Sequence, residues 1–220
     1  NGYRHNGENL GEHTQTVTKE ARKTAKENGL SNAEVDLVIL ASFFHDFGQN
    51  TGKKDEVVER KYDHENKSVE VMRRYAKEWG VDEEEILKVE KVILLDGIVS
   101  DIARGKVRSN EKNLSVVQFA EKLGGDVETL GILRAVNKAD VLATVGESGW
   151  AGIRIKYEKY FDDAELIING EEKAKEMEAR VEKKFSQIDL GEEVGPLKKL
   201  YLNAMEVVDK VRFAPFLGRK

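Results

Sequence analysis

The stretch from Val38 to Gln49, VILASFFHDFGQ, constrains the fold of this chain most strongly. Its first part is apolar except for Ser42, and a run that is apolar on every side is typical of a buried helix. His45 and Asp46 follow this run directly. A buried carboxylate and imidazole need partners, because an unpaired buried charge is costly. The stretch therefore predicts a central helix with a polar site at its end, and a metal ion is the simplest partner for that site.

The two ends of this central helix can be read from the sequence. Ser31 and Glu34 form a capping box, in which each side chain bonds the backbone N–H of the other residue. Gly48 is of the residue type that commonly follows the end of a helix. We therefore expect His45 and Asp46 in the last turn, where both can reach one ion off the helix end.

The remaining chain predicts further helices. Apolar residues recur at helical spacing, and alternating strand patterns are absent. We expect an all-α protein, in which residues 1–149 form a helical bundle and residues 150–220 form a helical extension that packs on the bundle or on a second subunit. The bundle helices are expected at about residues 10–28, 63–80, 82–96, 114–123 and 126–145, beside the central one.

Two helices are expected between residue 150 and residue 187. The first carries Tyr157, Tyr160 and Phe161, for which core packing is favoured over the stacking of nucleic-acid bases. A last helix after Pro196 has an apolar stripe that is too continuous to face water alone. This stripe is the reason to expect that the extension packs on another surface.

Composition excludes several classes of function. The chain has no cysteine, so any metal must be held by nitrogen and oxygen. Its net charge of -5 argues against a general nucleic-acid or membrane-surface binder. We see no secretory signal and no apolar run of transmembrane length, and we expect a cytoplasmic protein. The chain begins with Asn1 and not with methionine, which leaves open that it belongs to a longer protein.

Several polar residues stand where the helical pattern predicts an apolar one: His13, His45, Asp46, His64 and Asp140. Two imidazoles and two carboxylates make a complete donor set for Mn²⁺, Fe²⁺, Mg²⁺ or Zn²⁺. Such an ion lowers the pKa of water and polarises an electrophile, so this donor set is typical of a hydrolytic site. The set in this chain is His13, His45, Asp46 and Asp140.

The order His … His-Asp … Asp, with a further His after the pair, resembles the HD-domain superfamily of metal-dependent phosphohydrolases. The matching segments are EHTQTV, FFHDFGQ, DHENKSVEVM and NKADVLAT, within residues 12–146. The resemblance implies an HD-domain helical bundle, a divalent ion and the hydrolysis of a phosphomonoester or phosphodiester. Residues 92–161 are also similar to the HD domain of the uridylyltransferase/uridylyl-removing enzymes, which implies a nucleotide or a nucleotidylated substrate. The other domains of those enzymes are not found in this chain.

The resemblance assigns roles to individual residues. Asp46 would bind the metal and orient or accept a proton from the attacking water, and His64 would be a second catalytic candidate. In relatives with two metals, the positions of His64 and Asp96 supply ligands, and these relatives often have histidine where this chain has Asp96. An aspartate can also bind a metal, so one or two ions are expected per chain. The alternatives are that His64 only contacts Asp63 or solvent at a helix N-terminus, and that Asp96 is a solvated acid in a turn.

Four basic residues are candidates for substrate phosphate contacts, although a solvated surface is favoured for each. They are Lys53, Lys67, Arg104 and Arg108. Relatives often have lysine where this chain has Gln49.

The expected partner is a small-molecule phosphoester or nucleotide, and a homodimer is an open alternative to a monomer. Two other functions remain open: a regulatory HD module that binds metal or nucleotide without catalysis, and a metal-dependent oxygenase of HD-like fold. Release of phosphate would separate the hydrolase from the regulatory module, and a requirement for oxygen would mark the oxygenase.

Overall fold

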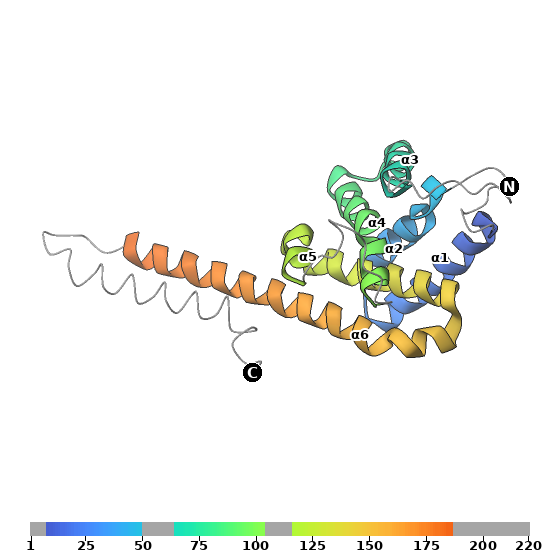
Figure 1. Ribbon diagram of the computed structural model, residues 1–220. Coiled ribbons are helices and arrows are strands. Elements are labelled where there is room, and N and C mark those ends of the chain that lie inside the picture. Colours follow the sequence, from blue (N-terminus) through green and yellow to red (C-terminus); the bar gives the residue numbers. More distant parts are fainter. Residues whose placement is uncertain (1–7, 50–63, 104–115, 187–220) are drawn as a thin grey trace, which may run out of the picture. The chain divides into compact units, whose positions relative to one another are not determined.

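The structure is a computed structural model that describes residues 8–49, 64–103 and 116–186 (Figure 1). In these ranges it contains six α-helices, one short 3-10 helix and no β-strand, which confirms the all-α expectation. The helices are α1 (Leu10–Glu27), α2 (Asn32–Phe44), α3 (His64–Glu78), α4 (Glu83–Ala103), α5 (Val116–Leu123) and α6 (Val127–Ser186). The 3-10 helix η1 (Phe47–Gln49) follows α2.

The chain divides into two compact units. The first comprises residues 1–114 and 128–161, and the second comprises residues 115–127 and 162–220. Helices α1 to α4, η1 and the first part of α6 belong to the first unit, together with all the candidate metal ligands. The expected domains of residues 1–149 and 150–220 stay a prediction, and the last helix of the predicted extension lies outside the described residues.

Helix α2 lies at the centre of the first unit, where it packs against α1, α3 and α4. The burial predicted for its apolar run holds in part: Phe43 is 41% exposed, and Ile39 and Leu40 are half-buried. The buried apolar residues of α2 are Val35, Leu37, Val38, Ala41 and Phe44. Each of the larger side chains contributes about 1.5–3 kcal/mol by leaving water. The capping box is also confirmed, because Ser31 N donates to Glu34 Oε2 over 2.7 Å and Glu34 N donates to Ser31 Oγ over 3.3 Å.

The end of α2 differs from the expectation. The α-helix ends at Phe44, so His45 is its C-cap and Asp46 lies beyond it. The carbonyl oxygen of Asp46 accepts a hydrogen bond from Gln49 N over 2.9 Å, and this bond between residues three apart forms the 3-10 helix η1. The absence of a side chain at Gly48 allows η1 to lie close to α3, since a Cβ there would lie 2.0 Å from the carbonyl oxygen of His64.

Helix α4 is longer than predicted. The sequence suggests that it stops near Asp96 and Gly97, but the helix continues to Ala103. Ile98 and Val99 are buried beyond the glycine, so tertiary packing outweighs the local preference for a turn. Asp96 is therefore inside a helix and buried, and its interpretation as a solvated acid in a turn is wrong.

Helix α6 contains one sharp kink. Gly146 has φ 69° and ψ 177°, a conformation that favours glycine, and the two helical parts meet there. After the kink the chain packs on the first part, because Tyr157 O–H donates to Arg134 O over 2.8 Å. Tyr157 and Phe161 are fully buried, which confirms core packing for them, and Tyr160 is 8% exposed. The two helices expected after residue 150 are one continuous helix to Ser186.

Among the described residues, no helix combines the length and the apolar character needed to cross a bilayer.

Candidate metal centre

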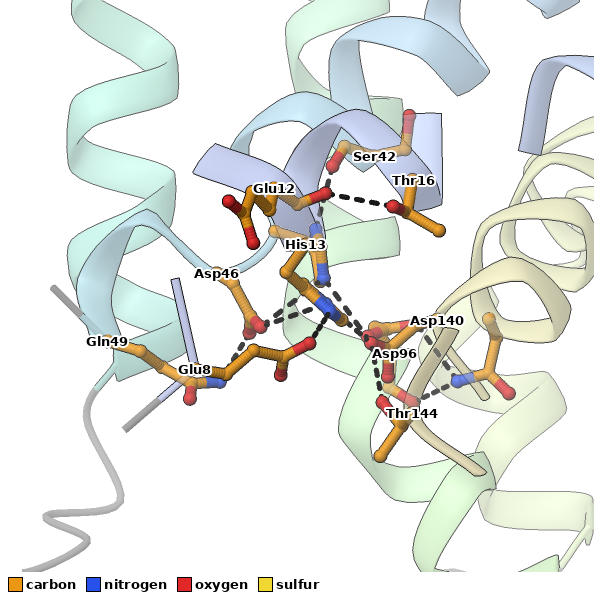
Figure 2. Close-up of polar contacts among 12 residues, drawn as sticks. Glu8, Glu12, His13, Thr16, Ser42, Asp46, Gln49, Asp96, Asp140 and Thr144 are labelled. Carbon is orange, nitrogen blue, oxygen red and sulfur yellow. Dashed lines mark hydrogen bonds and ion pairs between the residues drawn. The ribbon is translucent and has the colours of Figure 1, made fainter. Parts of the chain in front are cut away.

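Four of the predicted site residues meet at one point of the first unit (Figure 2). His13 comes from α1, His45 and Asp46 from the end of α2, and Asp140 from α6. All four are buried, and one donor atom from each lies within 4.8 Å of the others. The cluster is therefore suited to hold a metal ion.

The two imidazoles alternate with the two carboxylates around the cluster. His13 Nε2 lies 3.1 Å from Asp140 Oδ1 and 3.6 Å from Asp46 Oδ2. His45 Nε2 lies 3.5 Å from Asp46 Oδ2 and 3.6 Å from Asp140 Oδ1. Each ring nitrogen thus faces two carboxylate oxygens, so a cation between them would be surrounded by two nitrogen and two oxygen donors.

Contacts behind the rings explain why both present Nε2. His45 Nδ1 donates to the carbonyl oxygen of Ser42 over 2.7 Å, and His13 Nδ1 lies 3.4 Å from Glu8 Oε1. A metal-binding histidine commonly gives its other ring N–H to a carbonyl or carboxylate in this way. His45 Nε2 is buried and has no hydrogen-bond partner in the described part of the chain. A lone pair at this nitrogen fits a metal ligand, so the residues fit a bound ion.

The charges of the cluster favour a positive group at its centre. Burial by itself would lower the pKa of His45, but the negative charges of Asp46, Asp140 and Asp96 outweigh it and raise the pKa from 6.5 to about 10. Burial, together with repulsion from Asp140, raises the pKa of Asp96 from 3.8 to about 7. Without an ion, protons on these groups balance the carboxylates, and a divalent cation can take over that role.

Both carboxylates have a second contact outside the cluster. Gln49 Nε2 donates to Asp46 Oδ1, which leaves Oδ2 facing the histidines. Thr144 Oγ1 lies 3.4 Å from Asp140 Oδ1, one helical turn further along α6. These partners and Glu8 were not predicted from the sequence. For Gln49 and Thr144 the available signal is spacing, since residues three or four positions apart share one face of a helix. Glu8 lies five positions before His13 and has no such signal.

Asp96 lies close to the cluster but is not one of the four grouped donors among the described residues. Asn137 Nδ2 donates to Asp96 Oδ1 over 2.9 Å and also to its backbone oxygen. Asn137 precedes Asp140 by one turn of α6, and it too was missed in the sequence. The amide fixes the carboxylate on the Asp140 side of the cluster (Figure 2).

The other candidates are not brought into the cluster. The side chain of His64 is 29% exposed, and its Nδ1 lies 3.2 Å from Glu65 Oε2. Lys67 is exposed on the same helix. Lys53, Arg104 and Arg108 lie outside the described residues. Their roles, including a catalytic role for His64, stay predictions.

A cavity of about 690 Å³ runs along α1 and α2. Leu10, Ile39, Phe43 and Phe47 form an apolar part of its wall, and Lys19 lies on its rim. The four clustered donors do not line it. The candidate metal centre and this cavity are therefore separate features of the first unit.

Comparison with known proteins identifies the part of the chain that carries these donors. The family model described as HD domain matches residues 10–144, more than half of the chain, and includes all four clustered residues. No curated protein and no solved structure gives a match. These comparisons give no support to the specific resemblance to uridylyl-removing enzymes.

Proposed function

The chain belongs to the HD domain family, and on this premise we propose that it is a metal-dependent phosphohydrolase. The observation that carries the proposal is the buried group of His13, His45, Asp46 and Asp140, whose donor atoms lie within 4.8 Å of one another. An apolar side chain would be less costly at each of these buried positions. A structural role alone gives no reason for four such residues at one point.

The donor set narrows the choice of ion. Two imidazole nitrogens with two carboxylate oxygens suit Mn²⁺, Fe²⁺ or Zn²⁺ better than an ion that prefers oxygen alone. Mg²⁺ stays a candidate because of the carboxylates. When bound, a divalent ion supplies Lewis acidity, which lowers the pKa of water and polarises a phosphoryl oxygen.

The residues of the cluster would bind the ion and position the attacking water. His13, His45 and Asp140 hold the ion, with the rings oriented by Glu8 and by the carbonyl oxygen of Ser42. Asp46 adds its Oδ2 to the donor set, and we assign to its carboxylate the orientation of the attacking water or the acceptance of its proton. All four are buried, and exclusion of bulk water strengthens these interactions.

For the substrate we propose a small phosphoester, either a nucleotide or a nucleotidylated molecule. This choice rests on the resemblance of residues 92–161 to uridylyl-removing enzymes, which the sequence alone suggests and no comparison supports. His64 and Lys67 are proposed as phosphate contacts from α3, with Lys53, Arg104 and Arg108 as further candidates. A cytoplasmic location and the absence of general nucleic-acid or membrane binding are part of the same proposal. A homodimer stays an open alternative to a monomer.

A screen for released phosphate or nucleotide tests this function. The panel holds nucleoside mono-, di- and triphosphates, cyclic nucleotides, a nucleotidylated protein and a generic aryl phosphodiester, each with Mn²⁺, Zn²⁺, Fe²⁺ or Mg²⁺. We expect hydrolysis that falls about 100-fold or more in Asp46→Asn. The matched control is Asp36→Asn, because Asp36 is exposed on α2, and it should keep full activity.

Other results would point to the alternatives. Metal binding without hydrolysis of any ester would contradict the proposal and favour a regulatory module. Consumption of oxygen during turnover would identify the metal-dependent oxygenase.

A further inference from the structure

We infer that the metal centre holds a single ion, and that Gln49 maintains this state by occupying the oxygen of Asp46 that a second ion would need. This inference rests on the metal centre of the proposed function. It concerns the number of ions and the residue that sets that number, and it can be tested without measuring hydrolysis.

The two oxygens of Asp46 have different neighbours. Oδ2 lies 3.6 Å from His13 Nε2 and 3.5 Å from His45 Nε2, inside the four-donor cluster. Oδ1 accepts a hydrogen bond from the side-chain amide of Gln49. A carboxylate that bridges two ions binds one through each oxygen. The amide hydrogens, which carry partial positive charge, already lie at Oδ1, so a second cation at this oxygen must displace the Gln49 side chain.

The local backbone fixes Gln49 in this position. Gln49 N donates to the carbonyl oxygen of Asp46 over 2.9 Å, as part of the 3-10 turn η1. In a 3-10 turn, side chains three residues apart eclipse each other, whereas in an α-helix they are offset. The main-chain bond and the side-chain bond thus join the same two residues, and the turn geometry brings the amide over the carboxylate.

Packing against α3 holds the turn in place. Gly48 N donates to Ser68 Oγ over 2.9 Å. The turn also approaches the first residue of α3 so closely that a Cβ on Gly48 would lie 2.0 Å from the His64 carbonyl oxygen. Gln49 therefore follows a residue whose position is fixed by packing on α3. This packing supports the contact between Gln49 and Asp46.

The other groups expected to hold a second ion also have partners of their own. His64 Nδ1 lies 3.2 Å from Glu65 Oε2, and Asp96 Oδ1 accepts from Asn137 Nδ2 over 2.9 Å. In the described part of the chain, the grouped donors are the four around one position, and neither His64 nor Asp96 belongs to them. One oxygen of Asp96 is thus held by Asn137, and the His64 ring lies beside the Glu65 carboxylate.

Metal stoichiometry tests the inference directly. The full chain is saturated with Mn²⁺ and freed of unbound ion, and bound manganese per chain is then measured by elemental analysis. Electron paramagnetic resonance adds a second readout, since two adjacent Mn²⁺ ions couple magnetically and an isolated one does not. The variants are Gln49→Glu, which places a carboxylate beside Asp46 Oδ1, and Gln49→Ala, which removes the amide. Gln15→Glu, at an exposed position of α1, is the control for added charge.

We expect one ion in the unmodified protein and in Gln15→Glu, and a second, magnetically coupled ion in Gln49→Glu. Gln49→Ala should bind a second ion more weakly, at millimolar manganese. Circular dichroism verifies that each variant keeps its helical content. Two ions in the unmodified protein would overturn the inference, and one ion in both Gln49 variants would overturn the role of Gln49.

The outcome is separable from that of the proposed function. Absence of any bound ion would reject the metal centre and with it this inference. One ion in the unmodified protein and a second in Gln49→Glu, without hydrolysis of any ester, would support the inference and contradict the phosphohydrolase.

Discussion

His13 Nε2 lies 3.1 Å from Asp140 Oδ1, although 127 residues separate the two along the chain. The contact joins the start of α1 to the part of α6 that precedes its kink, and Asp46 adds the end of α2 at the same point. Because the ligands come from three helices, an ion bound to them would hold those helices together. Metal binding should therefore contribute to folding stability as well as to chemistry.

The first prediction concerns this coupling. An ion that binds only the folded state adds about 2.7 kcal/mol of stability at a concentration one hundred times its Kd. We expect Mn²⁺ to raise the Tm of the unmodified protein relative to protein in chelator. In Asp140→Asn this rise should disappear, whereas exposed Asp36→Asn should keep it. An equal rise in all three proteins would place the ion at another site.

The second prediction concerns the stability of the metal-free protein against pH. The pKa of Asp96 rises from 3.8 to about 7, so the folded state binds this proton more tightly than the unfolded state and loses stability as the pH rises between those values. The pKa of His45 rises from 6.5 to about 10, so its stabilising charge is fully present below pH 6.5 and is lost as the pH rises through 10. Both groups act in the same direction.

Urea unfolding in chelator at pH 5 and pH 9 measures the effect. We expect the free energy of unfolding to fall by more than about 1 kcal/mol between the two values. In Asp96→Asn, the decrease in the free energy of unfolding between pH 5 and about pH 7 that comes from Asp96 should be absent. Bound Mn²⁺ should make the free energy of unfolding decrease less between pH 5 and pH 9, because the ion supplies positive charge at both pH values. A metal-free protein that becomes more stable toward pH 9 would contradict the electrostatic description of the cluster.

The third prediction concerns the contact between η1 and α3. Gly48→Ala would place a methyl group 2.0 Å from the backbone oxygen of His64, so the turn or the helix must move. We expect a loss of about 2 kcal/mol or more in the free energy of unfolding, together with weaker metal binding. Gly131→Ala is the matched control, since it lies in α6 with no atom within 4 Å of the new Cβ. A gain of about 0.5–1 kcal/mol is expected there, and equal effects at the two positions would argue against the close contact.

How far the site could be predicted depends on the kind of residue. The four candidate metal ligands could be found because each interrupts an apolar pattern, and such an interruption is visible in the sequence. The helix breaks at Gly124 and Gly146 could likewise be predicted, because glycine readily adopts the positive φ that both residues have. The capping box at Ser31 depends only on residues three positions apart, so it too could be predicted.

The partners of these ligands could not be predicted in the same way. Glu8, Gln49 and Asn137 are ordinary polar residues in the sequence, and their roles depend on which tertiary neighbour they meet. The length of α4 also differs from the expectation, because the Asp96-Gly97 pair is typical of a turn when only the local sequence is considered. Burial of Ile98 and Val99 outweighs this preference, and it becomes visible only once the helices are packed.

The fourth prediction concerns Glu8, one of the residues that the sequence did not reveal. Glu8 Oε1 lies 3.4 Å from His13 Nδ1, on the side of the ring away from the cluster. Loss of such a second contact commonly weakens metal binding about 10–100-fold. Calorimetric titration of Glu8→Gln with Mn²⁺ should show a Kd raised by this factor and an unchanged stoichiometry. Glu12→Gln, an exposed neighbour on α1, should leave the Kd unaltered, and an unaltered Kd in Glu8→Gln would exclude the positioning role.

The central claim is that the cluster of His13, His45, Asp46 and Asp140 holds a divalent ion. Elemental analysis of the purified chain and of His45→Ala and Asp46→Ala, after equal exposure to Mn²⁺ and equal desalting, tests it most directly. We predict about one ion per chain in the unmodified protein and less than about a tenth of that in either variant, with helical content preserved in all three. Metal content that is the same in the unmodified protein and in both variants would contradict the account.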